Sequence, residues 1–122
     1  MRLKFGRPDI ERYRERFDVP VAEPDAALSI TWLGVSTLLV DDGTSAMMTD
    51  GFFSRPGLAE VGLGRLASSE SRIDYCLNRA GVNRLAAVLP VHTHYDHVLD
   101  SAAVARRTGA RLVGGEIGRA HV

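Results

Sequence analysis

Apolar and polar residues alternate in short runs over the first half of the chain. Residues 28–33 alternate, and two further apolar runs follow at 37–40 and 46–49. Gly34 separates the first two runs, and the turn signal Asp41-Asp42-Gly43-Thr44 separates the second from the third. Strands linked by such short connections pair with their neighbours. The pattern therefore predicts an antiparallel meander of three strands.

The pattern changes to a helical period further along the chain. Residues 52–64 contain Gly and Pro and predict a long loop with one helical turn. Ser71 is the predicted cap of a helix that ends at Gly81. One face of this helix carries Ile73, Cys76, Leu77 and Ala80. We expect that face to pack on the sheet.

A second strand and helix follow directly. Residues 85–89 form a continuous apolar run, typical of a strand buried on both faces, and Pro90 ends it. Apolar residues then recur at helical spacing from Val98 to Thr108, and residues 111–113 predict one more strand. This order predicts a βαβ unit, so the fold class is α/β (α+β).

The N-terminal segment differs from the rest. Asp9 can cap a short helix with Ile10, Tyr13 and Phe17 on one stripe, and a proline-containing connector follows. We therefore divide the chain into residues 1–25, a helix and connector, and residues 26–122, the compact domain.

Charge, cysteine content and the lengths of the apolar runs limit the functions and locations that the chain can have. The chain has 15 basic and 15 acidic side chains, so no overall charge attracts nucleic acid or an anionic membrane. Cys76 is the single cysteine, which excludes an internal disulfide and favours a reducing cytoplasm. No apolar run approaches the length of a membrane span, and no secretory h-region follows the basic N-terminus.

The segment from residue 92 to residue 97 contains the candidate metal ligands. His92 and His94 are two residues apart, so in an extended segment both imidazoles reach one metal ion. Asp96 and His97 follow a change of direction and can face a second ion. Nitrogen and oxygen ligands suit zinc, with iron and manganese as alternatives. The alternative without metal binding is that Asp96 only caps a helix and the histidines are surface residues.

The residues His92-Thr93-His94-Tyr95-Asp96-His97 match the HxHxDH motif and resemble the metallo-β-lactamase superfamily. Thr31-Trp32-Leu33-Gly34, Ser36-Thr37 and Thr49-Asp50 are similar to its lactonase-like and phospholipase-D-like branch. The resemblance implies the N-terminal half of an αββα sandwich. It further implies two ions with a bridging water or hydroxide that hydrolyses an ester, lactone, amide or phosphodiester.

By the same resemblance, His92 and His94 would hold the first ion and Asp96 and His97 the second. Asp96 would also orient the attacking water, which makes it the expected catalytic residue. Asp50 would accept a hydrogen bond from a ligand imidazole, although a simple Asp-Gly turn explains it equally well. The expected substrate is a small or lipid-like molecule.

The sequence departs from the family's pattern at two points. Val35 stands where members of this branch often have histidine, so the specific substrate of a family member cannot be assigned to this chain. The family also completes its site with ligands from a second half, which these 122 residues lack, and His121 is expected to be an exposed terminal side chain. Each ion would keep about two protein donors, so we expect this chain alone to be inactive or nearly so. We also expect this chain to self-associate, or to pair with a second half, through an exposed sheet face.

Other features have ordinary explanations. Trp32, Met47 and Met48 are predicted to lie in the core, and Phe52 and Phe53 to anchor their loop there. The stretch Gly62-Leu63-Gly64-Arg65-Leu66-Ala67 has the letters of a dinucleotide fingerprint without a preceding strand. Two other functions therefore stay open: a non-catalytic remnant or interaction module with weak metal binding, and a nucleotide-binding oxidoreductase.

Overall fold

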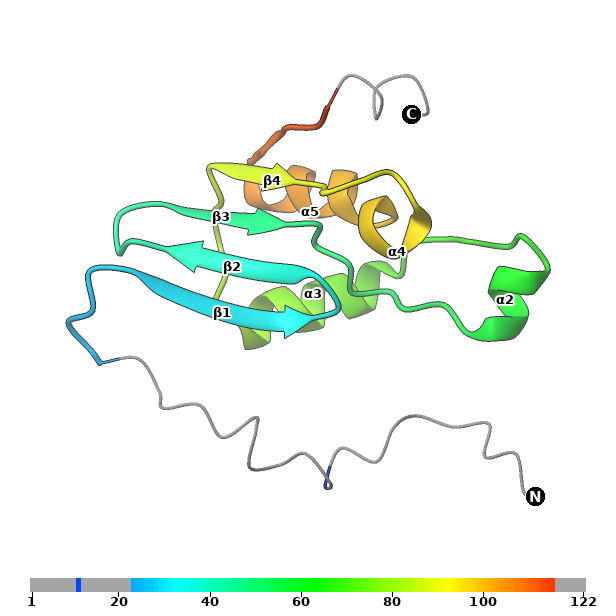
Figure 1. Cartoon of the computed structure of the whole chain (residues 1–122), viewed down its shortest axis with the longest axis horizontal. Helices are drawn as coiled ribbons and strands as arrows, with labels where there is room; N and C mark the ends of the chain where they lie inside the picture. Colours follow the sequence, from blue (N-terminus) through cyan, green and yellow to red (C-terminus); the bar gives the residue numbers. More distant parts are fainter. Residues whose placement is uncertain (1–10, 12–22, 116–122) are drawn as a thin grey trace.

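A computed structural model of the chain describes residue 11 and residues 23–115 (Figure 1). The fold is α+β. In chain order the elements are β1 (Ser29–Gly34), β2 (Thr37–Asp41), β3 (Ala46–Thr49), α2 (Leu58–Gly62), α3 (Glu70–Arg79), β4 (Ala87–Leu89), α4 (Tyr95–Val98), α5 (Ser101–Thr108) and β5 (Arg111–Leu112). The predicted helix and connector at the N-terminus lie outside the described residues, apart from residue 11 and the end of the connector.

The five strands form one mixed sheet in the order of the sequence, β1-β2-β3-β4-β5. The first three pair antiparallel, which confirms the predicted meander. β3 pairs parallel with β4, and β4 pairs parallel with β5, which confirms the βαβ unit. Since β1, β3 and β4 run in the same direction, the segments that follow these three strands meet at one end of the sheet (Figure 1). We call this the site end.

The hydrophobic core lies between one face of the sheet and helices α3 and α5 (Figure 1). Leu39, Met48 and Val88 are register partners on neighbouring strands and are nearly or fully buried. Ile73 of α3 and Val104 of α5 pack against them and are fully buried. Burying each such side chain contributes about 2 kcal/mol. This is the helix-covered half of a layered sandwich.

The opposite face of the sheet is exposed within the described residues. Ile30, Trp32 and Met47 lie on it and are 64%, 57% and 44% exposed. The prediction that Trp32 and Met47 are core residues is therefore wrong, whereas Met48 is fully buried as expected. Alternate residues of a strand face opposite sides of a sheet, and here the helices cover only the side of Met48. We call the exposed side the open face.

Several boundaries differ from the predictions. Helix α3 is capped at Ser69, two residues before the predicted Ser71. Only the central residue of β4, Val88, is fully buried, because the open face leaves Ala87 and Leu89 half-buried. The predicted single helix after the cluster is two helices, α4 and α5, and Asp100 is the N-cap of the second.

The glycine pattern near residue 62 lacks the context of a dinucleotide site. Gly62 ends α2, and residues 65–69 have no regular structure before α3 begins. A fingerprint requires a strand, a tight turn and a helix in succession. The oxidoreductase interpretation therefore has no support in the fold. Among the described residues, no helix has the length and apolarity needed to cross a membrane.

Candidate metal centre

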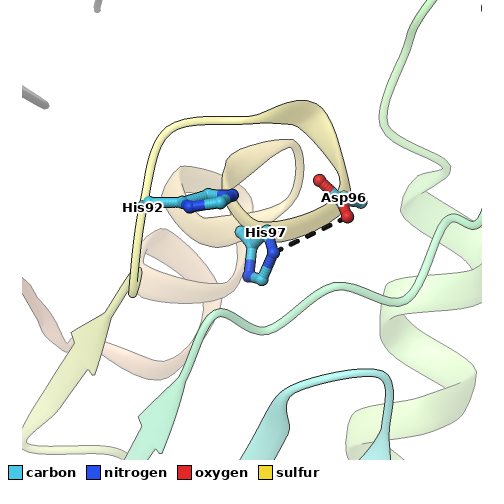
Figure 2. Close-up of side chains that lie close together, drawn as sticks. All are labelled: His92, Asp96 and His97. Carbon is cyan, nitrogen blue, oxygen red and sulfur yellow. Dashed lines mark ion pairs between the residues drawn. The ribbon is translucent and has the colours of Figure 1, made fainter.

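The metal-ligand candidates lie where β4 ends at the site end. The chain leaves β4 through Pro90 and turns into the short helix α4, whose N-cap is His94. Asp96 lies in the first turn of α4 and not at its cap, so the alternative in which Asp96 only caps a helix is wrong. Figure 2 shows the side chains of His92, Asp96 and His97 turned toward one another.

The donor atoms of these three side chains form a compact group. One ligand atom from each of His92, Asp96 and His97 lies within 4.8 Å of the others. The Nε2 atom of His97 is 3.6 Å from Oδ2 of Asp96, and the rings of His92 and His97 have centroids 4.1 Å apart. Such a group of imidazoles and a carboxylate suits a divalent transition metal.

His94 stands beside this group. Its ring centroid is 4.5 Å from that of His92, and the two rings meet edge to face. The side chain of His94 makes no capping hydrogen bond to α4. The structure thus groups the donor atoms of three of the four predicted ligands and places the ring of His94 against that of His92, while the assignment of particular ligands to particular ions stays a prediction.

A buried carboxylate, that of Asp50, contacts the loop that carries the ligand candidates. Asp50 follows β3, is fully buried, and its Oδ2 lies 2.7 Å from Nδ1 of His97. Its Oδ1 accepts a hydrogen bond from the backbone N–H of Val91 at 2.8 Å. Asp50 therefore contacts both ends of the ligand loop and lies at hydrogen-bond distance from the imidazole of His97, whose role as a metal ligand stays a prediction.

The contact with Asp50 fits His97 for metal binding. A carboxylate accepts hydrogen bonds, so the facing Nδ1 atom carries the proton and the lone pair lies on Nε2. Nε2 is the ring nitrogen nearer to Asp96. The donor set of the loop contains nitrogen and oxygen but no sulfur, because Cys76 lies on α3. These features suit a divalent transition metal.

A second buried carboxylate fixes the loop that follows Asp50. Asp100 accepts hydrogen bonds from the backbone N–H groups of Phe53 and Ser54, at 2.7 and 2.6 Å, and from the hydroxyl of Ser54 at 2.6 Å. Asp100 is fully buried. Ser101 next to it donates to the carbonyl of Asp50. Helix α5 thereby holds the segment that carries Asp50.

Phe52 and Phe53 are 4% and 2% exposed, which confirms that they anchor their loop. Phe53 belongs to the core cluster, and Phe52 meets the ring of Tyr95 edge to face with centroids 6.3 Å apart. Tyr95 is thus held against a buried aromatic ring beside the ligand candidates. It retains a partly exposed surface.

The sequence predictions assigned no role at the site to Ser36 or Asp100. Ser36, in the turn between β1 and β2, donates to Asp50, and Asp100 holds the Phe53–Ser54 segment. Asp100 had a weak signal, since Asp and Ser before an apolar helical pattern are typical of an N-terminus. Ser36 had only its place in a segment that resembles the family, because its contacts are with residues distant in sequence.

Comparison with known proteins adds an independent observation. No family model matches the chain. The chain is 34% identical over 96 residues to a "UPF0173 metal-dependent hydrolase" of Anaeromyxobacter sp., and this covers 75% of the chain and 30% of that relative. A protein of the same name from Methylobacterium nodulans is 35% identical over 86 residues, covering 70% and 31%. UPF0173 proteins are metallo-β-lactamase superfamily members.

The chain belongs to the metallo-β-lactamase superfamily. Its predicted resemblance is therefore confirmed, and its mixed sheet with helices on one face is consistent with half of the superfamily's sandwich. The chain spans about a third of the length of the curated relatives that it matches. No solved structure matches it. The names of the relatives support metal-dependent hydrolysis as the general chemistry of this group.

Proposed function

We propose that residues 92–97 form the metal-binding part of a hydrolase centre, with His92 and His94 on a first ion and Asp96 and His97 on a second. Zinc is the proposed metal, with iron and manganese as alternatives. The observation that carries this proposal is the convergence of the His92, Asp96 and His97 donor atoms within 4.8 Å. The contact between His97 and buried Asp50 adds to it, because it directs Nε2 toward the group.

The side chains have distinct roles in this proposal. A bound divalent cation would lower the pKa of a water ligand and polarise the bond under attack. Asp50 keeps the proton of His97 on Nδ1, and this leaves the Nε2 lone pair for the ion. The side chain of Asp96 is 43% exposed, so its carboxylate can accept a proton from an attacking water that enters from solvent. Asp96 is the proposed catalytic residue.

The proposed substrate is a small or lipid-like molecule with an ester, lactone, amide or phosphodiester bond. The four candidates supply about two protein donors to each ion, whereas catalytic zinc commonly has three. We therefore propose that further ligands come from additional polypeptide and that these 122 residues alone turn over poorly. The open face, with Ile30 and Trp32 more than half exposed, supports packing against a second sheet.

The open face also favours a second candidate function. A chain with an exposed apolar sheet face and weak metal binding can act as a non-catalytic interaction module. In that case metal would change the association state without producing hydrolysis. Gel filtration with and without zinc, together with a panel of ester, lactone and phosphodiester substrates, separates this function from the hydrolase.

Zinc titration of the purified chain tests the metal centre. We expect stoichiometric zinc in the wild-type chain and its loss in a His92→Ala, His94→Ala double variant. His121→Ala is the matched control, because it removes a histidine from outside the motif and should leave the stoichiometry unchanged. Zinc binding that is equal in wild type and double variant would overturn the proposal.

A further inference from the structure

The turn between β1 and β2 brings one hydroxyl into the support of the metal loop. Ser36 donates its hydroxyl hydrogen to Oδ2 of Asp50. The same Ser36 oxygen lies 3.0 Å from Nδ1 of His97, and Nδ1 lies 2.7 Å from that Oδ2. Three polar atoms from three segments of the chain therefore meet at one point beneath the ligand loop.

The positions of the hydrogens follow from this geometry. A serine hydroxyl has one hydrogen, and here it points to the carboxylate, which only accepts when ionised. The remaining lone pairs of Ser36 then face Nδ1 of His97. Both neighbours of Nδ1 are acceptors, so the Nδ1–H group donates to both. The neutral His97 ring is held in the tautomer that leaves Nε2 unprotonated.

The turn that presents Ser36 has a strained backbone. Val35 has φ 51°, in the left-handed region that β-branched residues rarely adopt. Gly34 has φ 104°, a backbone conformation that residues with a side chain rarely adopt. The turn therefore needs glycine at residue 34 and tolerates an unfavourable conformation at residue 35.

Side-chain hydrogen bonds hold this turn in place. The indole N–H of Trp32 donates to the carbonyl of Val35 at 2.9 Å, and Arg55 donates to the carbonyl of Leu33 at 3.0 Å. The hydroxyl of Thr49 donates to the carbonyl of Ser36 at 2.6 Å. These contacts fix the backbone on both sides of Ser36. They leave its side chain directed at Asp50 and His97.

We propose that Ser36 is a positioning residue of the metal centre. Asp50 sets the tautomer of His97, and Ser36 is the second acceptor that fixes the orientation of this ligand ring. This inference rests on the proposed metal-binding role of His97. A purely structural role, in which Ser36 only satisfies the carboxylate of Asp50, would change stability without changing the order of the His97 ring or the affinity for zinc.

The test compares Ser36→Ala with Ser36→Thr, which retains the hydroxyl, and with Ser29→Ala as control. Ser29 begins β1, and its hydroxyl donates to the carbonyl of Asp41, away from the site end. The readouts are zinc affinity by competition with a chelator and the ¹⁵N NMR signals of the His97 ring in the zinc-free chain, which report its tautomer and its order.

We expect Ser36→Ala to weaken zinc binding about 10- to 100-fold and to broaden the signals of the His97 ring, which keeps its Nδ1–H tautomer on Asp50 but loses its second contact. Ser36→Thr should restore both properties, and Ser29→Ala should match wild type. A Ser36→Ala variant with wild-type affinity and wild-type ring signals would overturn the proposal. If Ser36→Ala does not fold, the wild-type spectrum still decides, because a mixed or Nε2–H tautomer contradicts the inference.

The two proposals fail in different ways. If the wild-type chain binds no zinc, the proposed metal centre fails. The His97 ring signals of wild type and Ser36→Ala in the zinc-free chain are still compared, and they test the contact of Ser36 separately. If zinc binds but is insensitive to Ser36→Ala, the metal centre stands and the positioning role is wrong.

Discussion

The two ends of the sheet use aspartate in opposite ways. At the site end, Asp50 is fully buried, and its φ is 54°. At the other end, Asp42 is exposed in the β2–β3 turn, and the residue with positive φ is Gly43, which adopts this conformation readily. Among the described residues, the non-glycine residues with positive φ are Val35, Asp50 and Arg55, all of which belong to the site end. Backbone strain is thus concentrated where the candidate ligands lie, as is common at functional sites.

Removing Asp50 should have the largest effect. Asp50→Ala removes a fully buried carboxylate that accepts from the Val91 N–H and the Nδ1–H of His97, both part-buried contacts, which costs about 2–3 kcal/mol of unfolding free energy. Zinc affinity should fall by at least about 10-fold. Urea unfolding of the zinc-free chain and zinc competition measure the two effects. Unchanged stability would show that the buried carboxylate is not a support of the loop.

Asp100→Ala should destabilise the chain next most strongly, by about 2 kcal/mol, because two buried backbone N–H groups lose their acceptor. Since Asp100 holds the Phe53–Ser54 segment and contacts none of the ligand candidates, zinc affinity should fall less than in Asp50→Ala. Hydrogen exchange at Phe53 and Ser54 should accelerate. A larger loss of zinc affinity than in Asp50→Ala would contradict this division of roles.

Trp32→Phe tests the strained turn with a smaller change. The variant keeps an aromatic ring on the open face but removes the indole donor to Val35. We expect a loss of less than about 1 kcal/mol, because the contact is exposed to solvent. Broadened backbone NMR signals confined to residues 34–36 are the expected signature. Ile30→Val is the control, since it changes the same face without touching the turn.

Asp42 should give the smallest effect, with a definite pH dependence. Hydrogen bonds from the backbone N–H groups of Ser45 and Thr44 lower the pKa of Asp42 below its ordinary value. A lowered pKa in the folded chain means that the stabilisation is present above the unfolded pKa of about 3.9 and is lost as the pH falls through the lowered value. Asp42→Asn should remove this small acid-dependent loss and leave zinc binding unchanged. Unfolding curves measured from about pH 5 to pH 3 compare the two chains.

The sequence predicted those features that depend on neighbouring residues. The meander, the βαβ unit and the ligand cluster follow from short-range periodicity and from four polar residues within a six-residue segment. Exposure of Trp32 and Met47 could not be predicted in this way, because alternation identifies two faces of a strand without saying which one the helices cover. Burial is decided by the packing of α3 and α5.

The support of the cluster was only partly predictable for a related reason. Asp50 was expected from the resemblance, but Ser36 lies 61 residues from His97 and Asp100 lies 46 residues from Ser54. No local pattern connects residues so far apart. Their contacts exist only once β3 and β4 pair in parallel and the turn after β1 reaches the same end of the sheet.

The separation between a local cluster and its distant support affects the linkage between metal binding and folding. The four ligand candidates lie within six residues, so an unfolded chain keeps them close together and retains some affinity for zinc. The free energy by which zinc stabilises the native state then depends on the ratio of its affinities for the folded and the unfolded chain. Folding raises that ratio through Asp50, which lies 47 residues from His97. The melting temperature should therefore rise less with zinc than the measured native affinity alone would suggest.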